Sequence, residues 1–434
     1  MTTLVSVSEV LSGKSEGEAV TLRGWLHHRR SSGGILFLQL RDGTGIIQCT
    51  LKRDHVVPDK FERLEKTPLE STLEVTGSAH KDPRAPRGYE IQASDYVILT
   101  EALPDYPIAK KYHGPEFLLD HRHLTIRAAK MQSMLRIRAK VLEVARDWLK
   151  SEGYLEVQVP IIVTAAVEGG STLFELKYFD QRAYLTQSWQ LYAEAMISSV
   201  GKIYTFAPSF RAEKSRTRRH LTEYWHLELE APWMDLAGLM RVEELLVSHI
   251  AQQVAEQMAE ELRLHGRDPD YLKRVKPPFQ RITYDDAIRK LQSRKIAIKW
   301  GDDLGWDQEK VLASMFDSPF FVSHYPKGVK AFYHMPDPSR PEVTLSTDLL
   351  APEGYGEITG GGQRIHDLKQ ILARIEEDHL DPKAYEWYVD LRRYGTVPHS
   401  GFGMGLERTV AWLCKLKHIR DAIAFPRLIN RAYP

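Results

Sequence analysis

The stretch FRAEKSRTRRHLTEYWHLELE, at residues 210–230, decides how this chain is interpreted. Aromatic and β-branched residues on both sides of its charged run alternate in part, which predicts two strands joined by a charged loop. Arg211 then lies at the end of the first strand, and Tyr224 lies on the second. An arginine fork donates two hydrogen bonds to a phosphate, and an aromatic ring offers a face for a base. By itself, the pattern also fits a solvated, charged hairpin.

A second stretch, GFGMGLERTVAW at 401–412, favours the phosphate interpretation. Gly401, Gly403 and Gly405 leave one face of a predicted strand without side chains, which suits a ligand lying flat on the backbone. Arg408 follows at the start of a predicted buried helix, where phosphate is favoured by free N–H groups. The glycines also fit plain strand-to-helix packing. Phosphate-loop and dinucleotide-binding fingerprints are absent, so the two stretches predict a nucleotide site of another kind.

These stretches resemble motifs 2 and 3 of the class II aminoacyl-tRNA synthetases, and GYLEVQVPIIV at 153–163 resembles motif 1. The three motifs follow the order found in the aspartyl, asparaginyl and lysyl subgroup. The resemblance implies an α+β chain with an OB-fold β-barrel before a catalytic domain whose antiparallel sheet is flanked by helices. The implied boundaries are 1–103 for the anticodon-binding barrel, 104–126 for a hinge and 127–434 for the catalytic domain, with motifs at about 127–163, 203–230 and 401–414. It also implies a homodimer with Pro160 at its interface.

Composition agrees with this resemblance without pointing to it. The chain has 434 residues, of which 43% are hydrophobic and 27% charged, and its net charge is +1 at pH 7. Such values are typical of a globular protein with room for two domains. Without a long apolar run or a signal-like N-terminus, we expect a cytoplasmic protein with no membrane partner. Cys49 and Cys414 are the only two cysteines of the chain, which argues against a disulfide framework and against a four-ligand zinc site.

Short predicted strands between residues 18 and 100, broken by glycine, fit a small β-barrel. The resemblance implies that this barrel binds the anticodon of tRNA(Asn). In that interpretation Phe37 stacks on the central anticodon base, and stacking contributes about 1–3 kcal/mol per base. Gln48 and Glu90 read base edges, and Arg29 and Arg30 meet phosphates. Periodicity alone favours a core position for Phe37, and the resemblance reverses that balance.

Two acids upstream of motif 3, Asp348 and Glu357, lie on what the sequence predicts to be adjoining strand segments. Carboxylate oxygens suit Mg²⁺, which takes one or two carboxylates together with substrate phosphates. In related synthetases the matching acids hold the metal that bridges the ATP phosphates. Gly360 stands where aspartyl relatives have a serine as a further metal contact. The alternative is that both acids are surface residues beside a glycine-rich loop.

The resemblance implies that an amino-acid carboxylate attacks the α-phosphorus of ATP and that pyrophosphate leaves. Catalysis then rests on positioning and charge stabilisation, without a protein nucleophile. Arg211 is expected on the α-phosphate and Arg408 on the γ-phosphate, and these two are the expected catalytic residues. The full expected ATP-binding set is Arg211, Glu213, Arg219, His220, Leu221, Tyr224, Glu357, Gly405 and Arg408. The aminoacyl group then passes to the terminal adenosine of the tRNA.

Ala193 bears on which amino acid is loaded. Aspartyl enzymes of the subgroup have a lysine there that pairs with the substrate carboxylate, and a carboxylate without a partner is costly in a dry pocket. Glu228 replaces a shorter Asp, and the resemblance implies that it accepts from an amide NH₂ and repels aspartate. Arg364 is expected to donate to the amide oxygen. The remaining expected amino-acid-binding residues are Glu168, Gln187 and Gln190. Trp189 stands where relatives have proline and is expected to reshape the pocket wall.

The stretches 215–230 and 392–413 resemble asparaginyl enzymes more closely than aspartyl ones. We therefore expect ATP-dependent ligation of asparagine to tRNA(Asn). An aspartyl enzyme, including one that charges both tRNAs, stays open as an alternative. So do a paralogue that makes asparagine from aspartate and a non-catalytic RNA-binding module. Such a paralogue lacks an anticodon barrel, whereas this chain is expected to have one. A non-catalytic module would have lost phosphate or metal ligands, but Arg211, Asp348, Glu357 and Arg408 are all present. No role is assigned to residues 262–330.

Overall fold

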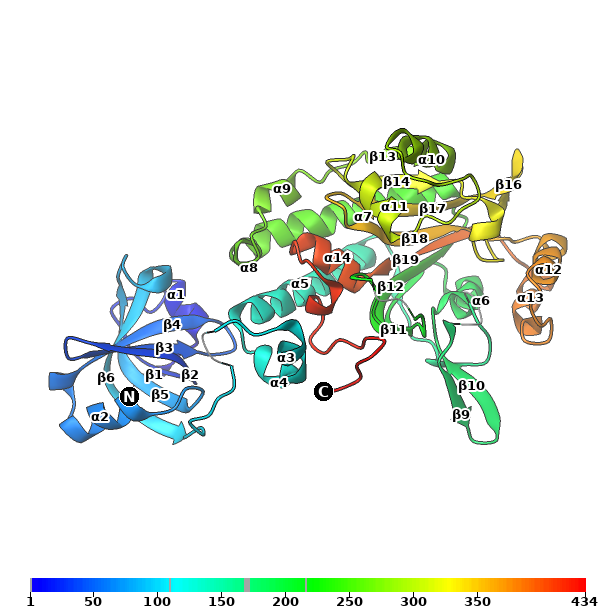
Figure 1. The fold of residues 1–434 in the computed structure, drawn as a ribbon. Helices are drawn as coiled ribbons and strands as arrows, with labels where there is room; N and C mark the ends of the chain where they lie inside the picture. The colour runs from blue at the N-terminus through cyan, green and yellow to red at the C-terminus, as the bar shows by residue number, and fades with distance from the viewer. Residues whose placement is uncertain (1, 109–110, 168–171, 215–216) are drawn as a thin grey trace. The chain divides into compact units, whose positions relative to one another are not determined.

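The computed structural model describes residues 2–108, 111–167, 172–214 and 217–434. They form two compact units, the first ending at Tyr112 and the second beginning at His113. Each unit has its own buried apolar core. Figure 1 shows a curled sheet in the first unit and a large sheet with helices in the second, which confirms the predicted α+β class.

The first unit is a β-barrel. Its elements are β1 (Thr3–Leu4), α1 (Val7–Leu11), β2 (Ala19–Ser32), β3 (Ile35–Arg41), β4 (Ile46–Lys52), α2 (Pro58–Lys66), β5 (Thr72–Lys81) and β6 (Tyr89–Thr100). The strand order is β1-β2-β3-β4-β6-β5, and β5 also pairs with β2, so the sheet closes on itself. Leu36, Leu38 and Leu40 are buried, whereas Phe37 and Gln39 between them are only partly buried. Phe37 therefore lies on the outer face and not in the core.

The second unit is built on an eight-stranded sheet ordered β13-β14-β17-β18-β19-β12-β11-β7. The strands are β7 (Leu155–Glu156), β11 (Ile203–Phe210), β12 (Glu223–Pro232), β13 (Gln280–Thr283), β14 (Phe320–Ser323), β17 (Ser346–Ala351), β18 (Gly356–Gln363) and β19 (His399–Gly405). The hairpin predicted from residues 210–230 is β11–β12. Because β12 pairs with β19 and β19 with β18, the two arginine-bearing stretches and the two predicted metal ligands share one sheet.

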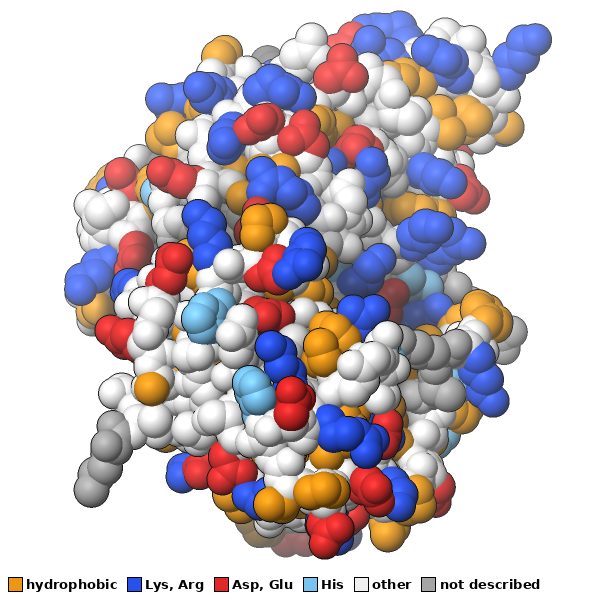
Figure 2. All heavy atoms as spheres, turned by 90° about the vertical axis from the view of Figure 1, so that its left-hand side faces the viewer, with side chains coloured by type: hydrophobic (Ala, Val, Ile, Leu, Met, Phe, Trp, Pro, Cys, Tyr) orange, Lys and Arg blue, Asp and Glu red, His pale blue; other side chains and the backbone are white. Residues whose placement is uncertain are grey.

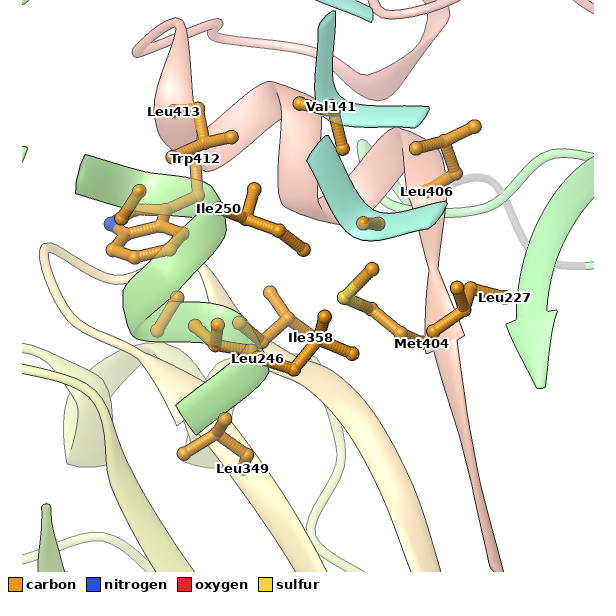
Figure 3. Close-up of a cluster of buried hydrophobic side chains, with 14 of the residues drawn as sticks. Val141, Leu227, Leu246, Ile250, Leu349, Ile358, Met404, Leu406, Trp412 and Leu413 are labelled. Atoms are coloured by element: carbon orange, nitrogen blue, oxygen red, sulfur yellow. The ribbon is translucent and has the colours of Figure 1, made fainter. Parts of the chain in front are cut away.

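Three helices cover one face of this sheet: α5 (Ala129–Ser151), α7 (Leu236–Gln257) and α14 (Leu406–Leu413). Figure 3 shows how Val141 of α5, Ile250 of α7 and Trp412 of α14 meet over Ile358 and Met404 of the sheet. The long apolar face of α5 is the one that helical periodicity predicts for residues 127–153. With this face filled, the other face of the sheet is left for a ligand.

The remaining elements surround the sheet. They are α3 (Pro115–Asp120), α4 (Arg122–Thr125), β8 (Ile162–Val163), β9 (Glu175–Tyr178), β10 (Gln181–Leu185), α6 (Gln190–Val200), α8 (Ala259–Leu264), α9 (Pro269–Lys273), α10 (Tyr284–Ser293), α11 (Trp306–Ala313), β15 (Pro336–Asp337), β16 (Arg340–Thr344), α12 (Leu368–Glu377) and α13 (Glu386–Arg393). The segment expected as a hinge, 104–126, thus contains two short helices.

The surface mixes both signs of charge. In Figure 2, Lys and Arg side chains alternate with Asp and Glu over the visible face, as the net charge of +1 suggests. Within the part of the chain that the structure describes, no helix is both long and apolar enough to cross a membrane.

Candidate active site

The open face of the sheet holds a cavity of about 460 Å³. Residues expected from the sequence that line it are Gln190, Arg211, Glu228, Asp348, Glu357, Gly360 and Arg364. A smaller cavity of about 70 Å³ is lined by Arg211, Arg219, His220, Leu221, Tyr224, Glu357, Gly405 and Arg408. Arg211 and Glu357 line both cavities, so the two are parts of one site. The larger cavity is called the amino-acid end below and the smaller one the nucleotide end, after the ligands that the sequence predicts.

At the nucleotide end, the side chains converge as the two sequence stretches predict. The Arg211 guanidinium lies 5.9 Å from the centre of the Tyr224 ring. Arg408, in the first turn of α14, donates from Nη1 to Glu357 Oε2 over 2.8 Å. Gly405 is the residue before that helix. The site therefore combines an aromatic face with two guanidinium groups, the combination that an adenine ring and a phosphate chain require.

The charged loop between β11 and β12 is held in place from outside the motif. Arg219 is buried, forms an ion pair with Glu309 of α11, and donates to the Glu357 carbonyl over 2.7 Å. Its guanidinium also lies 5.0 Å from the Trp306 ring. Arg219 is thus a structural link between the loop and β18 as well as an expected ATP contact.

Two histidines at this end are neutral. Burial, aided by Arg408, lowers the pKa of His220 to about 4. Burial, aided by Arg211 and then Arg408, lowers the pKa of His226 to about 3. Glu213 lies 3.6 Å from Arg211 and 3.8 Å from His220. The positive charge offered to phosphates at neutral pH therefore comes from the arginines, and the imidazoles serve as neutral hydrogen-bonding groups.

The predicted metal ligands meet at a glycine. A Cβ added to Gly360 would lie 3.0 Å from Glu357 Oε1 and 3.2 Å from Asp348 Oδ1, so both carboxylates face the space that a side chain here would fill. Lys330 Nζ lies 2.8 Å from each Asp348 oxygen. Burial raises the pKa of Asp348 to about 6, although Lys330 acts in the opposite direction. Burial also opposes ionisation of Glu357, but Arg408 and Arg219 outweigh it and lower its pKa to about 2.

This arrangement fits a hard divalent cation held by two carboxylates and substrate oxygens. No group of three or more acidic, histidine or cysteine side chains that would hold a metal occurs among the described residues. Gly360 adds no ligand atom from a side chain, and its contribution is the space itself.

At the amino-acid end, the expected residues are held by buried partners. Arg364 forms a double hydrogen bond with Glu230, at 3.1 and 3.0 Å. Glu228 accepts from the Ser188 hydroxyl and, over 3.2 Å, from the Trp189 N–H. A proline at position 189 would lack that N–H, so Trp189 and Glu228 form a linked pair.

Not every expected residue lines the pocket. The Ala193 side chain is fully buried with Trp189, Val157, Ile197 and Ile203, in an apolar cluster behind the pocket wall. Gln187 is also buried, accepting from the Val167 N–H and donating to Thr172 Oγ1. Glu168 lies outside the described residues. Gln187 therefore links Val167 to Thr172.

The structure adds residues that the sequence analysis missed. Lys330 pairs with Asp348 and Glu309 with Arg219, so residues 262–330 do contribute to the site. Glu194 lies behind Gln190. The sequence carries no motif for any of these three, because each acts through a partner in a different element.

The burial of Ala193 predicts the outcome of adding a lysine there. Ala193→Lys places an ammonium group in the apolar cluster, and we expect it to lower stability by about 3 kcal/mol or more. Adding Trp189→Pro makes room for the lysine and releases Glu228, so the double variant is expected to activate aspartate. Thermal unfolding and aspartate-dependent pyrophosphate exchange measure the two effects. Wild-type stability in the single variant would show that position 193 faces the pocket.

An antiparallel sheet that brings arginines and converging carboxylates to one face, in a chain that begins with a small β-barrel, is the architecture of the class II tRNA synthetases. The family model "tRNA synthetases class II (D, K and N)" matches residues 114–429, and the model "OB-fold nucleic acid binding domain" matches residues 20–99.

Known proteins of similar sequence and structure match nearly the whole length of this chain. An asparagine–tRNA ligase from Thermococcus gammatolerans is 51% identical over 96% of this chain and 97% of its own. The solved asparaginyl-tRNA synthetase from Pyrococcus horikoshii, complexed with asparaginyl-adenylate, is 50% identical over all of both chains, with a TM-score of 0.96. A putative aspartyl-tRNA synthetase from Leishmania major is 26% identical over 100% of this chain and 95% of its own, with a TM-score of 0.87. The chain belongs to the asparaginyl-tRNA synthetase family.

Proposed function

We propose that this chain ligates L-asparagine to tRNA(Asn) in two steps, through an asparaginyl-adenylate. The observation that carries the amino-acid assignment is the pairing of charges in the larger cavity. Lys330 is paired with Asp348 and Arg364 with Glu230, while Glu228 adds a further carboxylate. Among the described residues at this end, each cation that a substrate carboxylate could meet already has an acidic partner. A neutral side-chain amide, by contrast, would meet both donors and acceptors.

In the first step, an oxygen of the asparagine α-carboxylate attacks the α-phosphorus of ATP. The bond from that phosphorus to the bridging oxygen breaks, and pyrophosphate leaves with the electron pair. Arg211 neutralises charge on the α-phosphate, and Arg408 holds the γ-phosphate while Tyr224 stacks on the adenine. The protein's contribution is alignment and a preorganised positive field, since no side chain forms a covalent bond.

We propose Mg²⁺ as the metal of this reaction, held by Asp348 and Glu357 with substrate oxygens completing its coordination. When bound, it would neutralise phosphate charge and hold the triphosphate bent. Lys330 is paired with both oxygens of the Asp348 carboxylate and compensates its charge. In the second step, the 3′-hydroxyl of the terminal adenosine of the tRNA attacks the adenylate carbonyl, and AMP leaves.

The anticodon would bind the outer face of the barrel. On adjacent strands of that face, the Arg30 guanidinium lies 4.3 Å from the Phe37 ring, and Gln48 donates to Glu90 over 3.0 Å. These contacts support Phe37 as a stacking surface with a cation beside it. Arg29 instead donates to the Leu64 and Thr67 carbonyls at the end of α2, so its proposed phosphate contact would be made by its remaining N–H groups.

Phe37→Ala is expected to weaken tRNA(Asn) binding by about 1–3 kcal/mol, because it removes one base-stacking surface. The pyrophosphate exchange rate, which needs no tRNA, should stay at the wild-type value. Tyr89→Phe, on the same barrel, is a suitable control. Filter binding measures the tRNA affinity. Equal tRNA binding by Phe37→Ala and wild type would place the anticodon elsewhere.

We further propose a cytoplasmic homodimer that pairs through the segment around Pro160. Pro160 is exposed, and its neighbours Leu155, Ile161 and Ile162 are 51%, 42% and 44% exposed, an apolar strip that a second copy would cover. Sedimentation of the purified chain tests the dimer.

We also propose the domain limits that the resemblance implies, with the barrel ending at residue 103 and the catalytic domain beginning at residue 127.

ATP–pyrophosphate exchange with the purified protein and Mg²⁺, run with asparagine and with aspartate, tests the assignment. Exchange with asparagine alone supports it. Exchange with aspartate at a similar rate would move the chain to the aspartyl alternative.

A further inference from the structure

Behind the amino-acid end of the pocket lies a buried charged network centred on Glu194 of α6. Its carboxylate accepts from Gln190 Nε2 at 3.0 Å and from the Tyr388 hydroxyl at 2.8 Å, pairs with Arg392, and lies 2.9 Å from His399 Nε2. The side chains of Glu194 and Arg392 are each 1% exposed. A carboxylate this deep, with partners from α13 and β19, is fixed in one orientation.

The contact with Gln190 connects this network to the substrate pocket. Gln190 lines the larger cavity, and its side-chain amide has one end that donates and one end that accepts. An ionised carboxylate only accepts, so the NH₂ group of Gln190 must face Glu194. No described residue donates to Gln190 Oε1. The acceptor end of the amide is therefore the one left for the cavity.

The same network supports the segment around Arg364. Arg392 donates to the Ile365 carbonyl at 2.9 and 2.8 Å, and the Arg364 N–H donates to the His399 carbonyl at 2.9 Å. Burial opposes ionisation of Glu194, but Arg392 and His399 outweigh it and lower its pKa. The acceptor character of Glu194 thus persists at neutral pH.

We propose that Glu194 is a positioning residue that fixes the Gln190 amide so that its oxygen faces the pocket and accepts an N–H of the substrate. The inference rests on the proposed asparagine activation and names one source of its selectivity. The substrate donor is either the α-ammonium or the side-chain amide. Both supply an N–H donor, and the same experiment distinguishes them.

Glu194→Gln supplies both donor and acceptor, so the Gln190 amide can turn over. In pyrophosphate exchange we expect KM for asparagine to rise at least about 10-fold, with KM for ATP within about 2-fold of wild type. Gln190→Met should raise KM for asparagine by a similar factor, and combining the two changes should add no further rise. Tyr388→Phe removes a different hydrogen bond to the same carboxylate and is the matched control, with little change expected.

Glu194→Gln leaves the buried Arg392 without its carboxylate and risks misfolding. The variant Glu194→Gln/Arg392→Met removes both charges and is expected to reproduce the rise in KM for asparagine. If KM for asparagine and ATP rise together in it, or if the effects at 190 and 194 multiply, the inference is wrong.

A relaxed preference for asparagine over aspartate assigns the side-chain amide as donor, and equal losses for both assign the α-ammonium. Wild-type exchange with asparagine, run in parallel, tests the proposed function separately.

Discussion

Arg408→Ala is expected to reduce ATP–pyrophosphate exchange by about 10³-fold or more, the scale reported when a phosphate-stabilising arginine is removed. The change removes the cation that we propose for the γ-phosphate. It also leaves Glu357 without the guanidinium that lies 2.8 Å away and lowers its pKa. Exchange assays at saturating asparagine measure the loss.

Arg263→Ala is a matched control for Arg408→Ala, since Arg263 pairs with Glu260 on the exposed surface of α8. It should keep wild-type exchange. Binding of tRNA to the barrel should be the same in both variants. Exchange within about 10-fold of wild type in Arg408→Ala would remove Arg408 from the ATP site.

Arg364→Lys is expected to lower kcat/KM for asparagine by about 100-fold, or about 2.7 kcal/mol, mainly through KM. Lysine keeps the charge but cannot form the planar double hydrogen bond that Arg364 makes with Glu230. The buried Glu230 carboxylate then has a poorer partner, and the donor proposed for the substrate amide loses its fixed direction. KM for ATP should change little.

Arg340→Lys provides the control for this substitution, because Arg340 pairs with Asp285 and Glu342 away from the pocket. It should leave both KM values unchanged. If Arg364→Lys keeps the wild-type KM for asparagine, the amide oxygen is read by another residue.

Much of the nucleotide end was predictable because its residues sit in local patterns. Arg211 and Tyr224 lie on either side of the charged loop of a predicted hairpin, and Arg408 follows alternating glycines, so strand and helix periodicity place them on these elements. The resemblance then identified the family, and the comparisons confirm it. The outward position of Phe37 was not predictable from periodicity, which favoured the core, because alternation does not tell which of the two faces of a barrel strand is buried.

The amino-acid end was predicted less completely. Ala193 was expected at the pocket wall, but the first turn of α6 directs its methyl group into the apolar cluster around Trp189. Glu228 was expected to be free for the substrate, yet it accepts hydrogen bonds from Ser188 and Trp189. Both differences depend on how α6 packs against β12, which the linear sequence does not encode locally.

The sequence by itself determined the main elements, their order and the arginines proposed to bind phosphate, because periodicity and motif spacing are properties of neighbouring residues. Only the tertiary structure decided which charges neutralise one another. Arg219 pairs with Glu309 across 90 positions and Arg392 with Glu194 across 198, and Lys330 reaches Asp348 from a segment that had no assigned role. A charge that folding removes from water needs an opposite charge beside it, and here that partner is far away in the sequence. No local sequence pattern therefore indicates these pairs.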